Sequence, residues 1–174
     1  MNGSKDLKTI IYFKGVYDTL DLFTDHLIEA FESMGYGTFV YHTANEEVSK
    51  KLLLRLLGES QEFAAVTFNN LGYNLSFEQP EAAEDEEGKP EEHNIWDYFH
   101  IPYIDILMDH PFHYEKPLCN MPETAVILCT DRNHEKYIRR FFKNIHQTDF
   151  LPHAGVELGH KHKPLNDRNI DVLY

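Results

Sequence analysis

The sequence predicts an α/β domain built on a doubly wound, mostly parallel, Rossmann-like sheet with helices on both faces. Short apolar runs alternate along the chain with longer segments in which apolar residues recur every three or four positions, as strands and helices do. The apolar runs are nearly continuous, which is typical of strands whose two faces are both buried. Strands of that kind, separated by helices, favour a parallel sheet covered by helices on each side.

Six apolar runs are the predicted strands of this sheet. They lie at residues 8–15, 38–42, 64–69, 103–109, 125–130 and 150–153. The strands and the helix stripes that cover them should form the core, so we expect a set of apolar side chains from both to be buried. This set is Leu27, Phe31, Val66, Phe68, Ile106, Ile127 and Leu128.

The segments between the strands carry helix signals, apart from a proline-bearing loop predicted at 110–122. Short polar side chains, which commonly cap helix N-termini, stand where four helices would begin. They are Asp18, Asn45, Asn94 and Asn133. Gly35 and Gly58 follow the first two segments, where glycine commonly ends a helix. Val48, Leu52 and Leu56 are spaced four residues apart, which predicts that they form the core-facing stripe of the second helix.

The composition excludes several classes of protein. Lys and Arg number 16 against 29 Asp and Glu, a formal net charge of −13, and so acidic a surface disfavours nucleic acid as the main ligand. No apolar run approaches the roughly 18 residues of a membrane span. The run at 9–13 is too short for a signal peptide. Cys119 and Cys129 lack metal-motif spacing, so we expect reduced thiols in a cytoplasmic protein.

The negative charge is concentrated at residues 78–92. This segment holds eight acidic residues and one lysine, and two prolines and a glycine interrupt it. Such a composition cannot bury enough apolar surface to offset the entropy of ordering, which predicts a flexible insertion. We expect the insertion to belong to one Rossmann-like domain at 1–158. Residues 159–174 are predicted to be a polar linker and the first strand of a second domain.

The polar residues that follow the predicted strands are candidates for substrate binding. In parallel α/β sheets, ligands bind outside the carboxyl ends of the strands. The candidates are Lys14, Tyr17, Asn69, Asn70, His113, Asp131 and His153. Structural roles compete with this interpretation, because turns and helix caps also favour Asn and Asp.

Asp109 and His110 follow the fourth strand and are the candidate catalytic pair. A carboxylate beside a histidine can orient the ring and stabilise its charged form, as a general base requires. The alternative is that Asp109 caps the following turn. A metal site at His110 and His113 is disfavoured, because Pro111 prevents a regular helix between them and no third ligand has motif spacing.

The first strand ends in a turn with a single glycine, Gly15. Dinucleotide sites need G-x-G-x-x-G at this point and P-loops need GxxxxGK[ST], and the sequence has neither. There is also no G-x-S-x-G, and Cys129 lies inside a predicted strand. Nucleotide binding at the first turn and serine or cysteine nucleophiles are therefore not supported.

Several segments, taken in order, resemble a known family. They read IIYFKGVYDTLDLFTDHLIEAFESMGY, TFNNLGYNL, IPYIDILMDHPFHY, VILCTDRNHEKYIRRFF and FLPHAGVEL. Together they resemble the N-terminal domain of bacterial GT-B-fold glycosyltransferase-like proteins of the CgeB-like spore-protein type. The resemblance covers nearly the whole chain apart from the acidic insertion, which departs from the family pattern.

The resemblance implies the N-terminal half of a two-domain glycosyltransferase. The N-terminal half shapes the acceptor side, and a C-terminal half binds a nucleotide-sugar donor. The chain alone would then need no cofactor, would transfer no sugar, and would have its own C-terminal domain and a sugar acceptor as partners. His110, steadied by Asp109, would activate the acceptor. The alternative function is a non-catalytic Rossmann-like module that binds a ligand or serves as a scaffold. A receiver-type domain is less consistent, because Lys14 and Gly15 stand where it needs paired acids.

Overall fold

The computed structural model describes residues 8–59, 62–78, 92–155, 164 and 167. It confirms the α/β architecture. Six strands form a sheet in the order β2-β1-β3-β6-β7-β8, and every neighbouring pair is parallel. The strands are β1 (Thr9–Lys14), β2 (Gly37–His42), β3 (Phe63–Phe68), β6 (Tyr103–Leu107), β7 (Ala125–Cys129) and β8 (Gln147–Phe150). The strand order reverses between β1 and β3, so the topological switch point lies there.

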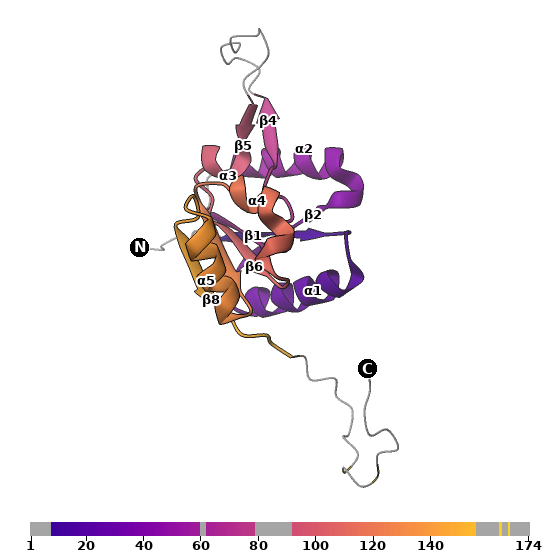
Figure 1. Cartoon of the computed structure of the whole chain (residues 1–174). Coiled ribbons are helices and arrows are strands. Elements are labelled where there is room, and N and C mark those ends of the chain that lie inside the picture. Colours follow the sequence, from indigo (N-terminus) through magenta and orange to yellow (C-terminus); the bar gives the residue numbers. More distant parts are fainter. Residues whose placement is uncertain (1–7, 60–61, 79–91, 156–163, 165–166, 168–174) are drawn as a thin grey trace, which may run out of the picture.

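Helices cover both faces of the sheet. In Figure 1, α1 lies below the sheet and α2 above it. The helices are α1 (Asp18–Ser33), α2 (Glu46–Leu57), α3 (Ile95–Tyr98), α4 (Glu115–Cys119) and α5 (Arg132–Phe141), with 3₁₀ turns η1 (Thr43–Asn45) and η2 (Pro111–Tyr114). Because side chains alternate across each strand, the two faces of the sheet support two separate apolar clusters.

The larger cluster lies on the face covered by α2, α3, α4 and α5. It is centred on Trp96, Tyr103, Leu107 and Ile127, all of them fully buried. The smaller cluster lies on the opposite face, where Tyr12, Val66, Phe68 and other strand residues pack against α1. Of the described helices, α1 is the only one that contributes to this smaller cluster. The two faces of the sheet are therefore covered to different extents.

Most of the predicted core is buried. Val66, Phe68, Ile106 and Ile127 are buried, as expected. The remaining three are partly exposed and pack against the smaller cluster; they are Leu27, Phe31 and Leu128. Leu27 and Phe31 lie in α1, where the helix meets the sheet, and Leu128 lies in β7 beyond the helix. Their partial exposure follows from the thinner cover of this face.

The apolar stripe predicted for the second helix is wrong. Val48 and Leu52 are 59% and 52% exposed, whereas Ser49, Leu53 and Leu57 are buried. The orientation follows from a polar contact as well as from packing. The Ser49 hydroxyl accepts a hydrogen bond from the His42 N–H and donates one to the His42 carbonyl, each at 3.1 Å. These two bonds turn the 49–53–57 face toward β2.

Several predicted boundaries also change. The last strand is Gln147–Phe150 rather than 150–153, because the polar edge residues 147–149 pair with β7. Asp18 is the first residue of α1 rather than its cap, and Tyr17 occupies the N-cap position of this helix. Asp131, not Asn133, caps α5. The loop predicted at 110–122 contains η2 and α4.

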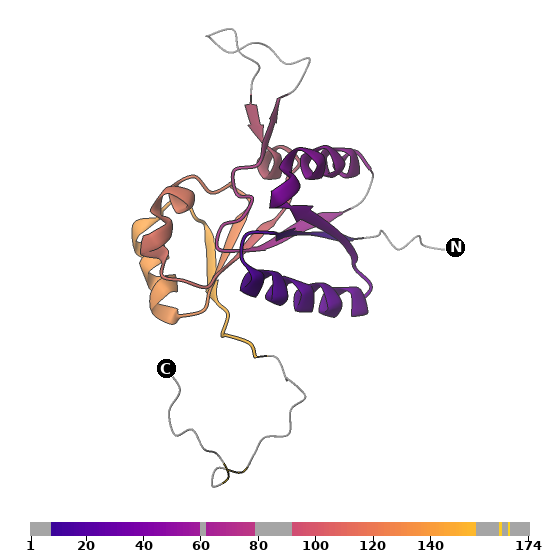
Figure 2. The same ribbon diagram turned by 90° about the vertical axis from the view of Figure 1, so that its right-hand side faces the viewer.

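A two-stranded antiparallel ribbon, β4 (Ser76–Glu78) and β5 (Glu92–Asn94), projects from the domain (Figures 1 and 2). It contains both ends of the predicted acidic insertion, Glu78 and Glu92, so the insertion begins and ends in strand rather than in loop. Residues 79–91 lie outside the described residues. Asn94 caps the next helix as predicted, since its side chain accepts from the Trp96 N–H at 3.0 Å. The predicted strand at 170–174 also lies outside the described part of the chain.

Candidate functional site

The turn after β1 is closed by acidic side chains of α1. The Gly15 N–H donates to both carboxylate oxygens of Asp21, at 3.0 and 3.1 Å, and Gly15 has a φ of 98°. Lys14 forms an ion pair with Asp25 at 2.6 Å. Tyr17 is 61% exposed at the start of the helix. A phosphate at this turn would meet the Asp21 carboxylate, which already takes the Gly15 N–H, and this agrees with the missing glycine motif.

The turns after β3 and β6 are joined by hydrogen bonds. Asn69 Nδ2 donates to Asp109 Oδ2 at 2.9 Å, and Asn69 Oδ1 accepts from the Met108 N–H at 2.9 Å. The Tyr114 hydroxyl also donates to Asp109 Oδ2, at 2.9 Å. The structure thus brings together two predicted site residues, Asn69 and Asp109. In this geometry the Asp109 carboxylate holds two loops to each other.

Asn70 and Asp105 continue this arrangement into the protein interior. The Asn70 N–H donates to Asp105 Oδ1 at 2.8 Å, and both residues are buried. Asn69 and Asn70 both have left-handed backbone conformations, with φ of 48° and 65°, which asparagine tolerates better than most residues. We call the set Asn69, Asn70, Asp105, Asp109 and Tyr114 the turn network.

Asp105 is the titratable group of the turn network that sequence analysis missed. It is fully buried in β6, and burial raises its pKa to about 7, against an opposing hydrogen bond from the Asn70 N–H. Its Oδ2 atom and both polar side-chain atoms of Asn70 have no hydrogen-bond partner among the described residues. The available signal was an acid inside an otherwise apolar strand, Tyr103–Leu107.

His110 has different partners from Asp109. Its Nδ1 accepts from the Phe112 N–H at 3.1 Å and so caps η2. Its ring lies against His134 and Tyr137, with centroid separations of 4.7 and 5.2 Å. Burial lowers the pKa of His134, and the neighbouring His110 lowers it further. In neutral His110, the lone pair that a general base would use points at the Phe112 amide.

Two further predicted residues have local contacts. Asp131 accepts from the Asn133 N–H at 2.6 Å, which is the capping role expected as the alternative to substrate binding. The His113 ring contacts Phe112 at a centroid distance of 5.9 Å, within η2. The described residues hold no group of three or more His, Cys, Asp or Glu side chains that could bind a metal ion.

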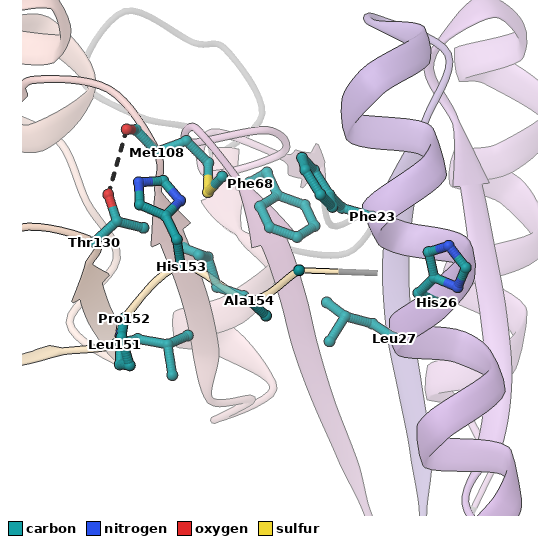
Figure 3. Close-up of a pocket in the computed structure, with 12 residues that line it drawn as sticks. Phe23, His26, Leu27, Phe68, Met108, Thr130, Leu151, Pro152, His153 and Ala154 are labelled. Carbon is teal, nitrogen blue, oxygen red and sulfur yellow. Dashed lines mark hydrogen bonds between the residues drawn. The ribbon is translucent and has the colours of Figure 1, made fainter. Parts of the chain in front are cut away.

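The structure has a cavity of about 310 Å³ at the carboxyl edge of the sheet, on the face covered by α1 (Figure 3). Phe23 and Leu27 of α1 form one wall, and Phe68 at the end of β3 forms the floor with neighbouring strand residues. The opposite wall is the chain that follows β8, residues 151–155. In Figures 1 and 2 this chain leaves the sheet on the side of α1.

The cavity results from the incomplete cover of this face. Helix α1 packs over β1 and β2 and reaches the end of β3 through Phe23, while Ile104 and Leu128 of β6 and β7 remain partly buried. Ile106 and Met108, at the end of β6, therefore line an open space between α1 and the segment after β8. A volume of this size falls at the lower end of the range for small-molecule sites.

His153 is the only residue of the predicted site that lines this cavity. Two other polar side chains line it, His26 of α1 and Thr130 after β7. The Thr130 hydroxyl lies 3.4 Å from the carbonyl oxygens of Leu107 and Met108, and His26 Nδ1 lies 3.6 Å from a carboxylate oxygen of Glu29. Sequence analysis missed the apolar lining because it searched the strand ends for polar residues alone.

Comparison of the chain with protein-family models, with curated proteins and with solved structures gives no match. In the part of the chain that the structure describes, no helix combines the length and the apolar character needed to cross a bilayer. Both cysteines are free thiols; Cys119 is exposed and Cys129 is buried. The fold and the geometry of the cavity therefore carry the functional argument.

Proposed function

We propose that this chain is the acceptor-binding half of a two-domain glycosyltransferase, and that the cavity binds the acceptor. The single observation that carries the proposal is the position of the cavity, at the carboxyl edge of a parallel sheet between α1 and the segment after β8. Ligands of open α/β sheets bind at this edge. The resemblance to GT-B-fold glycosyltransferase-like proteins gives this edge its role, since it faces the acceptor in that family.

The nucleotide-sugar donor belongs to a second domain in this proposal. The turn after β1 supports this division, because Asp21 occupies the Gly15 N–H that a phosphate would otherwise use. The domain described here would need no cofactor of its own. Its partners would be the acceptor and the donor-binding domain.

His153 replaces His110 as our preferred acceptor base. The lone pair of neutral His110 is taken up by the Phe112 N–H, and Asp109 bonds to Asn69 and Tyr114. His153 lines the cavity, where it can take a proton from an acceptor hydroxyl while the sugar carbon is attacked and the nucleoside diphosphate leaves. The proposal gives no role in the transfer step to residues that do not line the cavity, which include Lys14, Tyr17, Asn70, His113 and Asp131.

The test measures sugar transfer by the longest reading frame that contains this chain. With its acceptor present, that protein should release nucleoside diphosphate from one of a panel of UDP, GDP and dTDP sugars. Residues 1–174 alone should bind the acceptor and release none. His153→Ala should lower turnover by about 10²–10⁴-fold if it is the base, with His113→Ala as the matched exposed control. Transfer by residues 1–174 alone would refute the division into two halves.

A non-catalytic ligand-binding module is the second candidate. The turn network favours it, because the polar groups at the strand ends bind one another and hold loops. This function predicts a ligand in the cavity and no release of nucleoside diphosphate with any donor. Ligand binding that His153→Ala leaves intact, combined with no transfer by the longest reading frame, would establish it over the glycosyltransferase.

A further inference from the structure

We infer that the cavity takes a neutral molecule with an apolar, ring-containing body and few hydroxyl groups, such as a ring-containing alcohol, and that it does not take a saccharide. The inference rests on the proposed function, because this molecule would be the acceptor whose hydroxyl receives the sugar. It is carried by three properties of the cavity: the apolar and aromatic composition of its walls, the charge of its lining and the small number of hydrogen-bonding side chains within it.

The walls are aromatic and aliphatic, so they suit an apolar body. Phe23 and Phe68 approach each other from α1 and β3, with ring centroids 6.1 Å apart and an interplanar angle of 43°. Leu27, Ile106 and Met108 continue this apolar surface (Figure 3). Each Å² of apolar ligand surface removed from water here contributes about 25 cal/mol. A buried sugar hydroxyl without a partner would instead cost roughly 1–3 kcal/mol.

The charge of the lining selects a neutral ligand. The described residues around the cavity include no Asp, Glu, Lys or Arg. An ionised phosphate, carboxylate or ammonium group inside it would lose water without gaining an opposite charge, which is strongly unfavourable. The excess of acidic residues in the whole chain disfavours an anion further.

Among the described residues, the cavity offers three polar side chains to a ligand: Thr130, His26 and His153. The Thr130 hydroxyl lies near two backbone carbonyls, and His26 lies near Glu29. His153 has no hydrogen bond to any other described residue, and Figure 3 shows its ring at the Met108–Thr130 end of the cavity, away from His26. Neutral imidazole has one acceptor nitrogen and one N–H donor, so these few polar side chains can pair one or two ligand hydroxyls but not the many hydroxyls of a saccharide.

The experiment compares three probes of similar size on residues 1–174: a naphthol, the corresponding naphthalene sulfonate and methyl glucoside. Calorimetry should show binding of the naphthol, at least tenfold weaker binding of the sulfonate, and none of the glucoside. His153→Phe should keep the apolar surface and weaken naphthol binding about fivefold, the loss of one hydrogen bond of about 1 kcal/mol.

A blocking variant ties the binding to this cavity. Ala154 is exposed and lines the cavity, so Ala154→Trp should fill it and abolish naphthol binding while the domain stays folded by circular dichroism. Ala154→Ser is the matched control and should bind like the parent. Naphthol binding that survives Ala154→Trp would overturn the inference, as would tighter binding of the glucoside than of the naphthol.

The two proposals fail in distinguishable ways. If the naphthol binds in the cavity but the longest reading frame glycosylates no ring-containing alcohol with any nucleotide sugar, the ligand class stands and the glycosyltransferase function fails. If that protein transfers sugar to a saccharide while the naphthol does not bind, the function stands and the ligand class is overturned.

Discussion

The turn network and the cavity lie at the same edge of the sheet, but their composition differs. The polar groups of the network bond to one another, whereas the cavity is lined mainly by apolar side chains. In the network, Asp109 accepts from Asn69 and Tyr114, and Asp105 accepts from the Asn70 N–H. In the cavity, apolar side chains from α1, β3, β6 and the segment after β8 make up most of the described lining, and His153 is one of its few polar side chains. The comparison teaches that polar residues at strand ends do not by themselves mark a ligand site. Here they hold the loops together, and the open surface is apolar.

The largest effect on the free energy of unfolding is expected for a substitution of Gly72, in the turn that follows Asn70. It tests whether this turn is anchored on the core. Its φ is 77°, and a Cβ at this position would lie 2.3 Å from the buried Phe13 ring. Phe13 is packed between Tyr41 and Trp96 and has no room to move. Gly72→Ala should therefore reduce the free energy of unfolding by about 3–5 kcal/mol, as backbone strain and overpacking combine.

Urea unfolding measures this loss, and Gly35→Ala is the matched control. Gly35 also has a positive φ, of 90°, but nothing lies within 4 Å of an added Cβ. It should cost only the strain of a left-handed alanine, about 1 kcal/mol. Equal losses in the two variants would show that the turn after β3 is not anchored on the core.

The next effect is a pH dependence of stability set by Asp105. Its folded pKa of about 7 lies above the ordinary value of 3.8, so the folded state keeps a proton that the unfolded chain releases. Stability should therefore fall as the pH rises from about 4 through about 7, and should level off above that range. Between about pH 5 and pH 8 the expected loss is roughly 2–3 kcal/mol.

The Asp105→Asn variant tests this pH dependence. The amide cannot ionise, and its oxygen can still accept from the Asn70 N–H, so the variant should lose this part of the pH dependence and gain stability at about pH 8. Urea unfolding at about pH 5 and pH 8 gives the change in the free energy of unfolding for parent and variant. Subtracting the variant's change from the parent's removes the contribution of the other titrating groups. Parallel pH profiles would contradict a raised pKa at Asp105.

The smallest effect is expected at His110. A large effect there would contradict the distinction between the polar turns and the apolar cavity. His110→Ala removes one capping hydrogen bond to the Phe112 N–H on an exposed turn. The loss in the free energy of unfolding should be about 0.5–1 kcal/mol. Naphthol binding should be unchanged, because His110 does not line the cavity. A tenfold loss of naphthol binding, measured by calorimetry, would show that the turn after β6 contributes to the ligand site.

The sequence by itself determined the parallel α/β character of the sheet. The run Thr9–Lys14 is almost entirely apolar and is buried along nearly its whole length, which requires a strand covered on both faces. The helices between the strands require parallel crossovers, so the architecture follows from the order of the elements. Local caps with one clear polar side chain, such as Asn94, were also predictable, because the capping bond joins residues close in the chain.

The tertiary structure decided which surfaces face inward and where the open site lies. Helix α2 has apolar residues on more than one side, so its sequence pattern allowed Val48 or Leu53 to face the core; the bonds of Ser49 to β2 selected Leu53. The cavity depends on α1 covering only part of one sheet face and on the path of residues 151–155 after β8. These are relations between segments far apart in the chain, and local periodicity carries no information about them.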